Sequence, residues 1–457
     1  MNRYVLVDSS LQSGDFQQAD AVIQKAESEY GAKSRVLYWM DRGMTLHLAG
    51  QYQQSNEVLE QAEEEIDRLY TRVIRTETAA FLTNDNALPY GGEPYEQVMI
   101  NVLKALNYAA LHQWQDALVE ARRIDHRLNL LSDRAKDKGV YRDDGFARYL
   151  SGILYESAGD LNNAFIAYRN AYETFEATRG WSQIGVPVQL RADLLRTADA
   201  LHLNQEFLEY QRTFPNTTWQ SVEAQRQLAQ VVVISYNGRA PRKEDQFLDL
   251  PISLDALQLV LINRGFSQSN RQQFRAFDSV LYGLNGRVVR VALPTLVRQK
   301  TQVPVDTFTL LPENGTPLTV QTELVQNVTA LADKVLSERI AGITMKALAR
   351  AAVKFSLAEG ATRGAQQAAG KDAAWVGLVV GLITKGFAVA SEESDKRSWR
   401  TLPDEVHLAR VWIPPGQYRV QGAHLIGADD SGGSGTTGRS FSLRSGDTTL
   451  VIQRVIP

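Results

Sequence analysis

Cysteine is absent from the 457 residues of this chain. Disulfide bonds, thiol nucleophiles and cysteine-ligated zinc or iron–sulfur centres are therefore excluded. Charge of one sign is also scarce, because 49 basic residues stand against 52 acidic ones and the formal net charge is −3. A chain so balanced carries no electrostatic signal for nucleic acid or for an anionic membrane surface. We therefore expect no nucleic-acid partner.

Sequence signatures of catalysis are missing as well. The P-loop, HExxH, GxSxG and dinucleotide-binding patterns do not occur. The six histidines are scattered along the chain, and none has the spacing of a metal ligand to another. We therefore predict no cofactor and no metal, and we expect a protein that is not an enzyme.

The composition is that of a folded protein. Hydrophobic residues make up 44% and charged residues 22%, which is typical of globular proteins. The length suffices for two or three domains. The residues after Met1 lack the apolar run of a secretory signal peptide. This pattern fits either a cytoplasmic protein or a mature form whose export signal has been removed.

The first half of the chain has helical periodicity, with apolar residues three and four positions apart over residues 8–225. A short phrase recurs in it, a turn with Gly or Gln followed by a large apolar residue. The phrase occurs as Gly14-Asp15-Phe16, Gly50-Gln51-Tyr52, Gln113-Trp114 and Gly159-Asp160-Leu161. Gly50 follows Gly14 by 36 positions, close to the tetratricopeptide repeat. We predict a tetratricopeptide-like array over residues 1–225, with an unrelated helical bundle as the alternative.

A loop rich in proline and glycine, LPYGGEPYE, interrupts these helices at residues 88–96. Pro94 suits the first turn of the next helix, where Glu96 would lie near the positive helix end. One interpretation is a rigid corner between repeats. The other is a shaped loop that meets a ligand or partner, with Tyr90, Tyr95 and Glu96 as candidate contact residues.

The segment ALVEARRIDHRL, which begins at Ala117, is dense in charge. Its side chains either build a polar site or form a solvated helix face with local ion pairs. We retain Arg122 and Arg123 as candidate partner-binding residues.

The second half of the chain changes to strand-like sequence near residue 226. A β-branched run, QVVVISYN, is followed by short strand-like runs, by EVHLARVWI and QYRVQGAHLI, and by a closing hairpin, FSLRSGDTTLVIQRVI. Alternating apolar residues indicate one buried face. We therefore predict an α+β fold. In it an antiparallel β domain, a sandwich or barrel over residues 226–457, carries a Gly/Ala-rich helical insert at residues 329–393.

The insert contains small residues at positions that suit close helix packing. Gly360 with Gly364 and Gly377 with Gly381 are each four positions apart on one helical face. Residues 373–390 would reach roughly 27 Å as a helix, against about 30 Å of membrane hydrocarbon, and include a lysine. We expect a helix covered by protein, in this fold or in a homo-oligomer, with membrane contact as the alternative.

A polar and aromatic cluster follows the insert. Its members are Asp395, Arg397, Trp399, Arg400 and Arg410. As a site, the cluster suits an anion or the carboxylate of a partner. As a structural element, Trp399 would fill the junction between helices and sheet while the charges pair locally.

Four phrases of the sequence are distinctive in combination. They are YGGEPYEQVMINVLKALNYAAL, DALVEARRIDHRL, VVVISYNGRAPRKE and DKRSWRTLPDEVHLARVWIPPGQY. In these phrases the chain resembles a family of bacterial envelope lipoproteins. The resemblance implies a tetratricopeptide-like N-terminal region, a β-rich C-terminal region and export. It also implies outer-membrane attachment through a lipidated N-terminal cysteine that this sequence lacks, and it supplies no catalytic residues.

These observations lead to three hypotheses. The first is a non-enzymatic scaffold or assembly protein of the bacterial envelope, periplasmic and associated with the outer membrane. It would bind a protein partner through its helical-repeat groove and its β domain. The second is a ligand receptor or enzyme with a polar site built from Arg397, Arg400, Arg410 and the loop from Tyr90 to Tyr95. The third is a self-assembling ring or oligomer that packs through the Gly/Ala helices.

Overall fold

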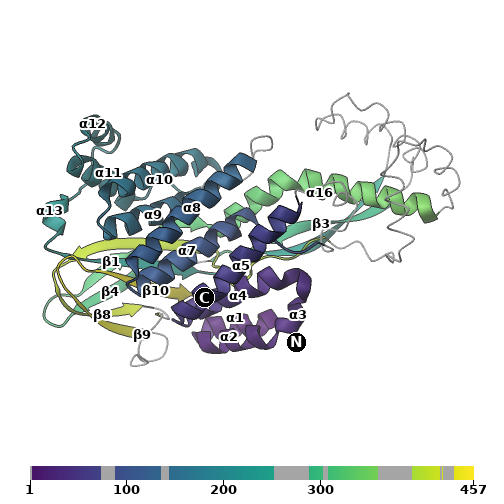
Figure 1. Ribbon diagram of the computed structural model, residues 1–457, viewed down its shortest axis with the longest axis horizontal. Coiled ribbons are helices and arrows are strands. Elements are labelled where there is room, and N and C mark those ends of the chain that lie inside the picture. Colours follow the sequence, from purple (N-terminus) through teal and green to yellow (C-terminus); the bar gives the residue numbers. More distant parts are fainter. Residues whose placement is uncertain are drawn as a thin grey trace.

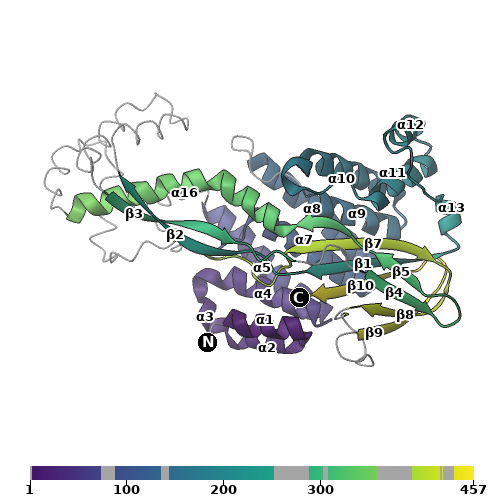
Figure 2. The same cartoon turned by 180° about the vertical axis from the view of Figure 1, so that it is seen from behind.

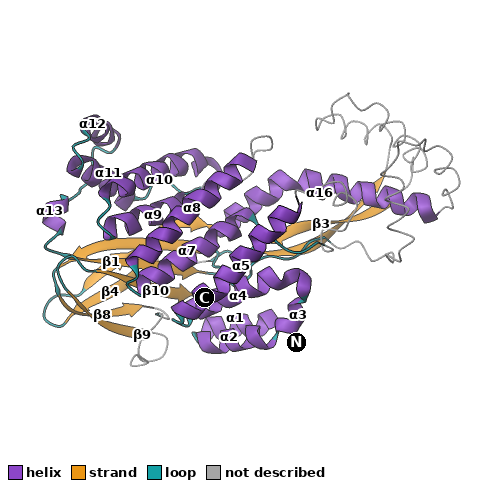
Figure 3. Cartoon of the chain, viewed as in Figure 1, coloured by secondary structure: helices purple, strands orange, loops and turns teal. Residues whose placement is uncertain are grey.

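Helices form the N-terminal half of the molecule, and strands with one long helix form the C-terminal half (Figures 1 and 3). The computed structural model describes residues 3–73, 88–134, 144–251, 288–301, 307–358, 394–422, 425 and 437–456. The predicted seam of Gly360, Gly364, Gly377 and Gly381 lies outside the described residues. The apolar run at residues 373–390 lies outside them as well.

The N-terminal helices form successive antiparallel pairs. The pairs are α1 (Arg3–Ser13) with α2 (Phe16–Lys25), α4 (Arg35–Leu48) with α5 (Tyr52–Val73), α7 (Pro94–Ala110) with α8 (Trp114–Arg134), α9 (Gly145–Ser157) with α10 (Leu161–Ser182), and α11 (Val188–Ala200) with α12 (Asn204–Thr213). Short helices α3 (Glu27–Tyr30), η1 (Ala32–Ser34) and α13 (Val222–Gln225) complete this region. The prediction of a tetratricopeptide-like helical region is confirmed.

Each of these pairs turns through a residue in the left-handed conformation. The residues are Gly14 (φ 78°), Gly50 (φ 72°), His112 (φ 57°), Gly159 (φ 85°) and His202 (φ 56°). At the second turn, the Gly50 N–H bonds the His47 carbonyl and the Gln51 N–H bonds the Leu46 carbonyl. The other turns repeat this double bond, which satisfies the last carbonyls of the first helix. The recurring sequence phrases therefore mark the turns.

Two four-stranded sheets stack to form a sandwich. The first has the strand order β10 (Thr448–Val455), β1 (Ala229–Asn237), β7 (Glu405–Ile413) and β6 (Glu323–Asn327). The second has the order β5 (Leu318–Gln321), β4 (Thr307–Pro312), β8 (Gly416–Gly422) and β9 (Thr437–Leu443). The predicted sandwich is therefore present.

Two details of the predicted β domain are wrong. β1 pairs with β10 in parallel, so the first sheet is mixed and not purely antiparallel. The closing segment is not a hairpin, because β9 belongs to the second sheet and β10 to the first. The turn between these strands, at Gly446 with φ 81°, therefore carries the chain from one layer to the other.

Strand β1 is buried on both faces, which explains the apolar run from Val231 to Ile234 at its centre. Val232 and Ile234 pack in a core shared with the helices. The alternate residues Val231 and Val233 pack in a second core with Phe308 of β4. The molecule thus has three layers, with helices on one face of the first sheet and the second sheet on its other face (Figures 1 and 2).

The first sheet lies against the helical pairs and closes that side of the array. The hydroxyl of Tyr236 on β1 lies 3.2 Å from Nε2 of His47 on α4. The amide of Gln326 on β6 donates to Asp144, the N-cap of α9, at 2.9 Å. Helix-pair arrays usually bind partners on an extended concave surface. In this chain its own strands lie against one side of the helices.

An arm extends from the three-layered body (Figures 1 and 2). It consists of α16 (Val328–Ala358) and the paired strands β2 (Arg242–Pro251) and β3 (Val288–Val297). With 31 residues, α16 is about 46 Å long. The predicted insert is therefore helical from its start as far as Ala358. The beginning of α16 is covered by protein, because Leu331 and Val335 are buried.

Candidate functional site

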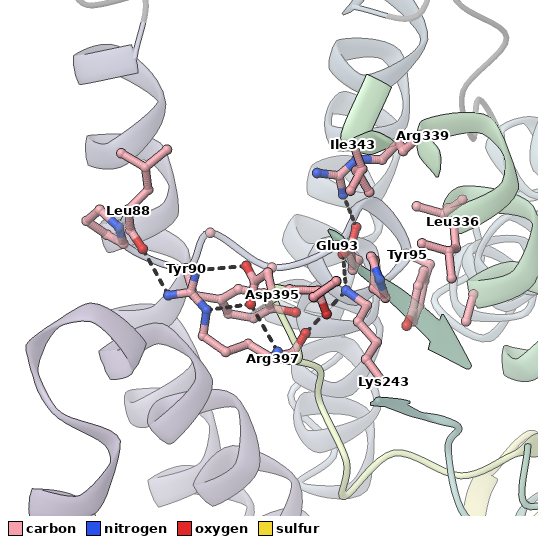
Figure 4. A pocket seen from close by; sticks show the side chains of 18 residues that line it. Leu88, Tyr90, Glu93, Tyr95, Lys243, Leu336, Arg339, Ile343, Asp395 and Arg397 are labelled. Atoms are coloured by element: carbon pink, nitrogen blue, oxygen red, sulfur yellow. Dashed lines mark hydrogen bonds and ion pairs between the residues drawn. The ribbon is translucent and has the colours of Figure 1, made fainter. Parts of the chain in front are cut away.

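A cleft opens where the arm joins the body, and we call it the arm cleft (Figure 4). It encloses about 250 Å³. Its walls come from the loop at residues 88–93, the first turn of α7, strands β2 and β3, helix α16 and the segment at residues 394–397. Segments that are far apart in the sequence therefore meet at this one point.

Glu96 organises the loop that forms one wall of the arm cleft. It stands in the first turn of α7, as predicted, and is fully buried. Its Oε2 accepts hydrogen bonds from the Tyr90 hydroxyl at 2.6 Å and from the Glu93 N–H at 2.8 Å. Its Oε1 accepts from the Trp399 N–H at 2.8 Å. One carboxyl group thus fixes the loop, the helix start and the segment after the insert.

The environment of Glu96 disfavours its charge. Burial is the largest effect, and the neighbouring charge of Glu93 adds to it. Together they raise the pKa of Glu96 to about 7, although Lys243 and the N–H of Trp399 act in the opposite direction. The carboxyl therefore changes its protonation near neutral pH.

Glu93, the N-cap of α7, joins the body to the arm. Its carboxylate pairs with Lys243 of β2 and, at 2.5 Å, with Arg339 of α16 (Figure 4). Burial alone would raise its pKa, but the two cations outweigh burial and lower the pKa to about 2. Glu93 is consequently an anion at every physiological pH and anchors both elements of the arm.

Arg397 holds the loop from the other side. Its guanidinium pairs with Asp395 at 2.7 Å and donates to the carbonyl of Leu88 at 2.9 Å. The same group lies 5.1 Å from the centroid of the Tyr90 ring. Two predicted features, Arg397 and the Tyr90–Tyr95 loop, therefore do come together at the arm cleft.

The rest of the lining is largely apolar. Leu336 and Ile343 of α16 face the cleft together with Tyr95 (Figure 4). The described charges at the cleft, Glu93 with its two cations and Asp395 with Arg397, are paired with one another. The cleft thus combines apolar side chains with charged groups that neutralise one another.

Trp399 fills the junction between helices and strands. It is 1% exposed, and its indole N–H donates to the Thr401 hydroxyl at 2.9 Å. That hydroxyl donates in turn to Asp41 of α4 at 2.9 Å, and Asp41 also accepts from Tyr4 and Tyr30. This arrangement is the structural role considered for Trp399.

Arg410 and Arg400 do not join Arg397 in one site. Arg410 lies on β7, is 4% exposed and pairs with Glu156 at 2.7 Å and with Asp193 at 3.0 Å. Arg400 stacks on the ring of Tyr4 at 4.0 Å. The three arginines of the second hypothesis therefore contact three different sets of partners.

The charged segment of α8 contributes to a network between helices. Lys104 of α7 is 1% exposed and pairs with Glu63 at 2.9 Å and Glu120 at 3.1 Å. Arg123 also pairs with Glu63, at 3.2 Å, from the edge of this network. Arg122 is exposed. Most of the segment therefore contributes to packing and ion pairs between α5, α7 and α8, and only part of it is a solvated helix face.

Sequence reasoning missed the cations that hold Glu93. Lys243 lies 150 positions after Glu93 and Arg339 lies 246 positions after it. A basic loop around Lys243 was visible, but nothing in it specified a carboxylate partner. Only the pairing of β2 with β3 and the packing of α16 bring the three residues together.

The described part of the chain has two further properties. It contains no group of His, Asp and Glu side chains that could hold a metal ion. None of its helices combines the length and apolarity needed to cross a membrane.

Comparisons with known proteins give little beyond this geometry. No family model and no curated protein matches the chain. Among solved structures, the crystal structure of MamA is 14% identical with a TM-score of 0.29, covering 46% of this chain and 94% of that one. A Podosopora anserina putative kinesin light chain with nearly identical TPR-like repeats is 15% identical with a TM-score of 0.31, covering 47% and 92%.

A third similar structure is the Rap conjugation gene regulator of the plasmid pLS20 in complex with the Phr* peptide. It is 14% identical with a TM-score of 0.27, covering 46% of this chain and 53% of that one. Values this low carry no argument about function. The helix-pair architecture rests instead on the repeated turn geometry of this chain.

Proposed function

We propose that the chain is a non-enzymatic scaffold protein that binds a protein partner at the arm cleft. The observation that carries this proposal is a cleft lined by apolar side chains and paired charges, beside a helical array packed on its own sheet. One side of that array is covered by the first sheet and is not free for a partner. The arm cleft presents apolar side chains from both the body and the arm.

The ionisable groups of the arm cleft support binding over catalysis. A general base at neutral pH needs a pKa near 7 and access to a substrate. Glu93 lacks the first property, because its two cations lower its pKa to about 2. Glu96 lacks the second, because it is fully buried and already accepts bonds from the Tyr90 hydroxyl and two N–H groups.

The size of the arm cleft favours an anchor from a protein over a free ligand. Small-molecule pockets usually enclose about 300–1,000 Å³, and this cleft encloses about 250 Å³. Protein interfaces concentrate their affinity in a few large side chains that fill such pockets. An apolar or aromatic side chain of the partner would contact Leu336, Ile343 and Tyr95.

Site-specific photocrosslinking tests this proposal. A photoreactive amino acid at Leu336, in the cleft, is compared with one at Val119, which is 41% exposed on α8. We expect one defined adduct from position 336 and none of that mass from position 119. Leu336→Arg, which places a charge in the apolar cleft, should remove an adduct formed from position 343. Equal adducts from all positions would contradict the proposal.

The proposed location is the bacterial cell envelope, on the periplasmic side of the outer membrane. It is supported by the resemblance of the four sequence phrases to envelope lipoproteins. Intact-mass measurement of the protein purified from its native cells tests it. A mature N-terminal cysteine that carries lipid is expected, and an unmodified protein in the soluble cytoplasmic fraction would contradict it.

A small-ligand receptor is the second candidate function. It is favoured by the meeting of Arg397 with the loop from Tyr90 to Tyr95 at the arm cleft. Native mass spectrometry of the purified protein distinguishes the two candidates. A bound small molecule that Leu336→Arg displaces would support the receptor, whereas an empty protein that still forms the partner adduct would support the scaffold.

A further inference from the structure

Arg454 is a buried cation that has no ion-pair partner among the described residues. It lies near the end of β10 and is 0% exposed. One of its nitrogens, Nη2, donates to the carbonyls of Gly238 at 2.8 Å and Leu402 at 3.4 Å. Its Nε and Nη1 are buried and have no hydrogen-bond partner in the structure. Two nitrogens of one guanidinium, which together carry three N–H donors, therefore lack an acceptor among the described residues.

Other buried arginines of this protein are neutralised. Arg410 and Arg196 are almost fully buried, and each of them pairs with both Glu156 and Asp193. A buried guanidinium that lacks such partners is costly. Burial lowers the pKa of Arg454 to about 9, and the charge of Arg239 acts in the same direction. Arg454 is therefore the exception that needs an explanation.

Further arginines surround Arg454. Arg239 lies 3.9 Å from Asp8 of α1, and its Nε is also buried without a hydrogen-bond partner. Arg400 is held over the Tyr4 ring and forms no ion pair among the described residues. Burial raises the pKa of Asp8, and Arg239, Arg400 and Arg454 all act against that rise. Contacts place the three arginines together as well: Arg454 donates to the carbonyls of Gly238, which precedes Arg239, and of Leu402, which lies shortly after Arg400. Arg239 and Arg400 both lie against α1, at Asp8 and at Tyr4.

Another arginine near Asp8 is already paired. Arg242 also acts on Asp8, but its guanidinium pairs with Glu244 at 2.7 Å. The remaining three guanidiniums and one carboxylate leave an excess of positive charge where α1 meets the ends of β1 and β10. The side chains of Arg239 and Asp8 are 24% and 28% exposed, so these two members are reached from the surface, whereas Arg454 is buried beneath.

We propose that Arg454, Arg239 and Arg400 form an anion-binding site whose ligand is a phosphate group. A phosphate carries up to two negative charges and several acceptor oxygens, which match the excess charge and the unsatisfied donors. Guanidinium groups are the usual partners of phosphate because they present several donors in a fixed plane. Asp8 lies at the entrance and holds Arg239 until the anion arrives. This site is separate from the arm cleft and does not depend on its function.

Calorimetric titration with inorganic phosphate tests the site. The full-length protein is titrated with phosphate and, at matched ionic strength, with chloride. We expect one saturable phosphate site, with binding weakened by roughly tenfold or more in Arg239→Gln, as loss of a charge-assisted hydrogen bond predicts. Arg68→Gln, which removes an exposed arginine paired with Glu65 on α5, should leave the binding unchanged. A titration in which phosphate releases or absorbs no more heat than chloride would overturn the proposal.

Two further variants separate a binding role from a structural one. Asp8→Asn removes the competing carboxylate, so phosphate should bind more tightly to it than to the native protein. Arg454→Met removes the uncompensated charge, so its melting temperature without phosphate should equal or exceed that of the native protein and should no longer rise on adding phosphate. A strongly lowered melting temperature with an unchanged phosphate response would contradict the proposal.

The source of the phosphate group is distinguished by a vesicle experiment. Vesicles that contain a lipid with a phosphate monoester headgroup are compared with vesicles of a zwitterionic lipid. Sedimentation with the first vesicles only, lost in Arg239→Gln, assigns the site to a membrane lipid. Saturation by free phosphate without sedimentation assigns it to a soluble phosphate compound. Sedimentation that Arg239→Gln does not reduce would overturn the assignment to this cluster.

Discussion

Single buried carboxyl groups hold distant segments of this molecule together. Glu96 joins the loop at residues 88–93 to Trp399, and Asp41 joins Tyr4 and Tyr30 to Thr401. Each accepts several hydrogen bonds where no water competes, so each bond is strong and its loss is costly. The fold therefore depends on a few acceptors more than on any surface ion pair.

Glu96 should make stability depend on pH near neutrality. Its pKa of about 7 in the folded protein exceeds the ordinary value of 4.5. The folded state therefore keeps a proton that the unfolded state loses, and stability falls as pH rises from about 4.5 to 7. We expect this group to contribute a loss on the order of 3 kcal/mol over that interval.

The measurement compares urea unfolding of the native protein and Glu96→Gln at pH 5 and pH 7.5. The glutamine has no proton to lose, so the difference between the two proteins isolates this residue from the other titrating groups. In Glu96→Gln the side-chain amide nitrogen replaces one of the two accepting oxygens and faces a hydrogen-bond donor. The substitution should therefore lower the free energy of unfolding by about 1–3 kcal/mol at pH 5. A pH dependence that is equal in both proteins would show that Glu96 does not titrate in this range.

His202 should be less favourable than glycine at its turn. It has φ 56°, is exposed, and stands where other pairs have Gly14, Gly50 or Gly159. A side chain in the left-handed conformation costs roughly 1–2 kcal/mol. His202→Gly should therefore raise the free energy of unfolding by about 1 kcal/mol, measured by urea denaturation. The matched control is Gly159→Ala, which should lower it by a similar amount.

At the scale of elements, buried ion networks connect the helices to the sheet. Arg410 of β7 and Arg196 of α11 share Glu156 of α9, and both stack on the Trp412 ring at 4.6 Å and 4.9 Å. The desolvation of such a network is nearly balanced by its attractions when it is complete. Removal of one member leaves a buried charge unpaired.

This balance predicts a strongly non-additive double-mutant cycle. Arg410→Met should destabilise the protein by about 3–5 kcal/mol, because Glu156 and Asp193 then share a single guanidinium. The double variant Arg410→Met with Glu156→Gln should recover part of that loss. Urea unfolding of both single variants and the double variant provides the cycle. Additive losses would show that the two side chains are not coupled.

Local signals in the sequence predicted the elements and not their partners. The turns at Gly14, Gly50 and Gly159 were visible because a left-handed residue favours glycine. The pair that turns at His202 was missed, because this turn has no glycine and, unlike the turn at His112, is not followed by a Gln-Trp phrase. β1 was predicted from its β-branched run, but its parallel partner β10 was not, since register between distant strands leaves no local trace.

The residues of the arm cleft also show that local sequence signals do not reveal partners that are distant in the sequence. Its loop at residues 88–96 and the residue Arg397 were singled out, because proline, glycine and clustered charge are visible locally. The anchors Lys243 and Arg339 were not, because their meeting with Glu93 depends on how the arm packs on the body.

At the scale of the whole molecule, buried ion pairs and hydrogen bonds fix the arm to the body. Glu93 binds Lys243 of β2 and Arg339 of α16, and Asp404 accepts a hydrogen bond from Thr329 in the first turn of α16 at 2.5 Å. These contacts set the direction of the arm and hence the shape of the arm cleft. A substitution at Glu93 should therefore make β2 and the first turns of α16 less stably held.

Glu93→Gln should loosen the arm without unfolding the body. The amide cannot pair with both cations, so amide hydrogen exchange in β2 and in the first turns of α16 should become faster. Exchange in α9 and α10 should stay unchanged. Hydrogen exchange with mass spectrometry measures both regions, and Glu64→Gln, an exposed change on α5, is the matched control. Uniformly faster exchange would contradict a local role.

The parallel pairing of β1 with β10 also governs how the protein can be made. β1 begins at residue 229, whereas its partner β10 begins at residue 448. During synthesis the helical pairs emerge before these strands, and the strand that completes the sheet beneath them leaves the ribosome long after β1. Until then, apolar side chains of the helices and an open strand edge stay uncovered. Folding in the cell should therefore depend on a chaperone that shields this unfinished layer.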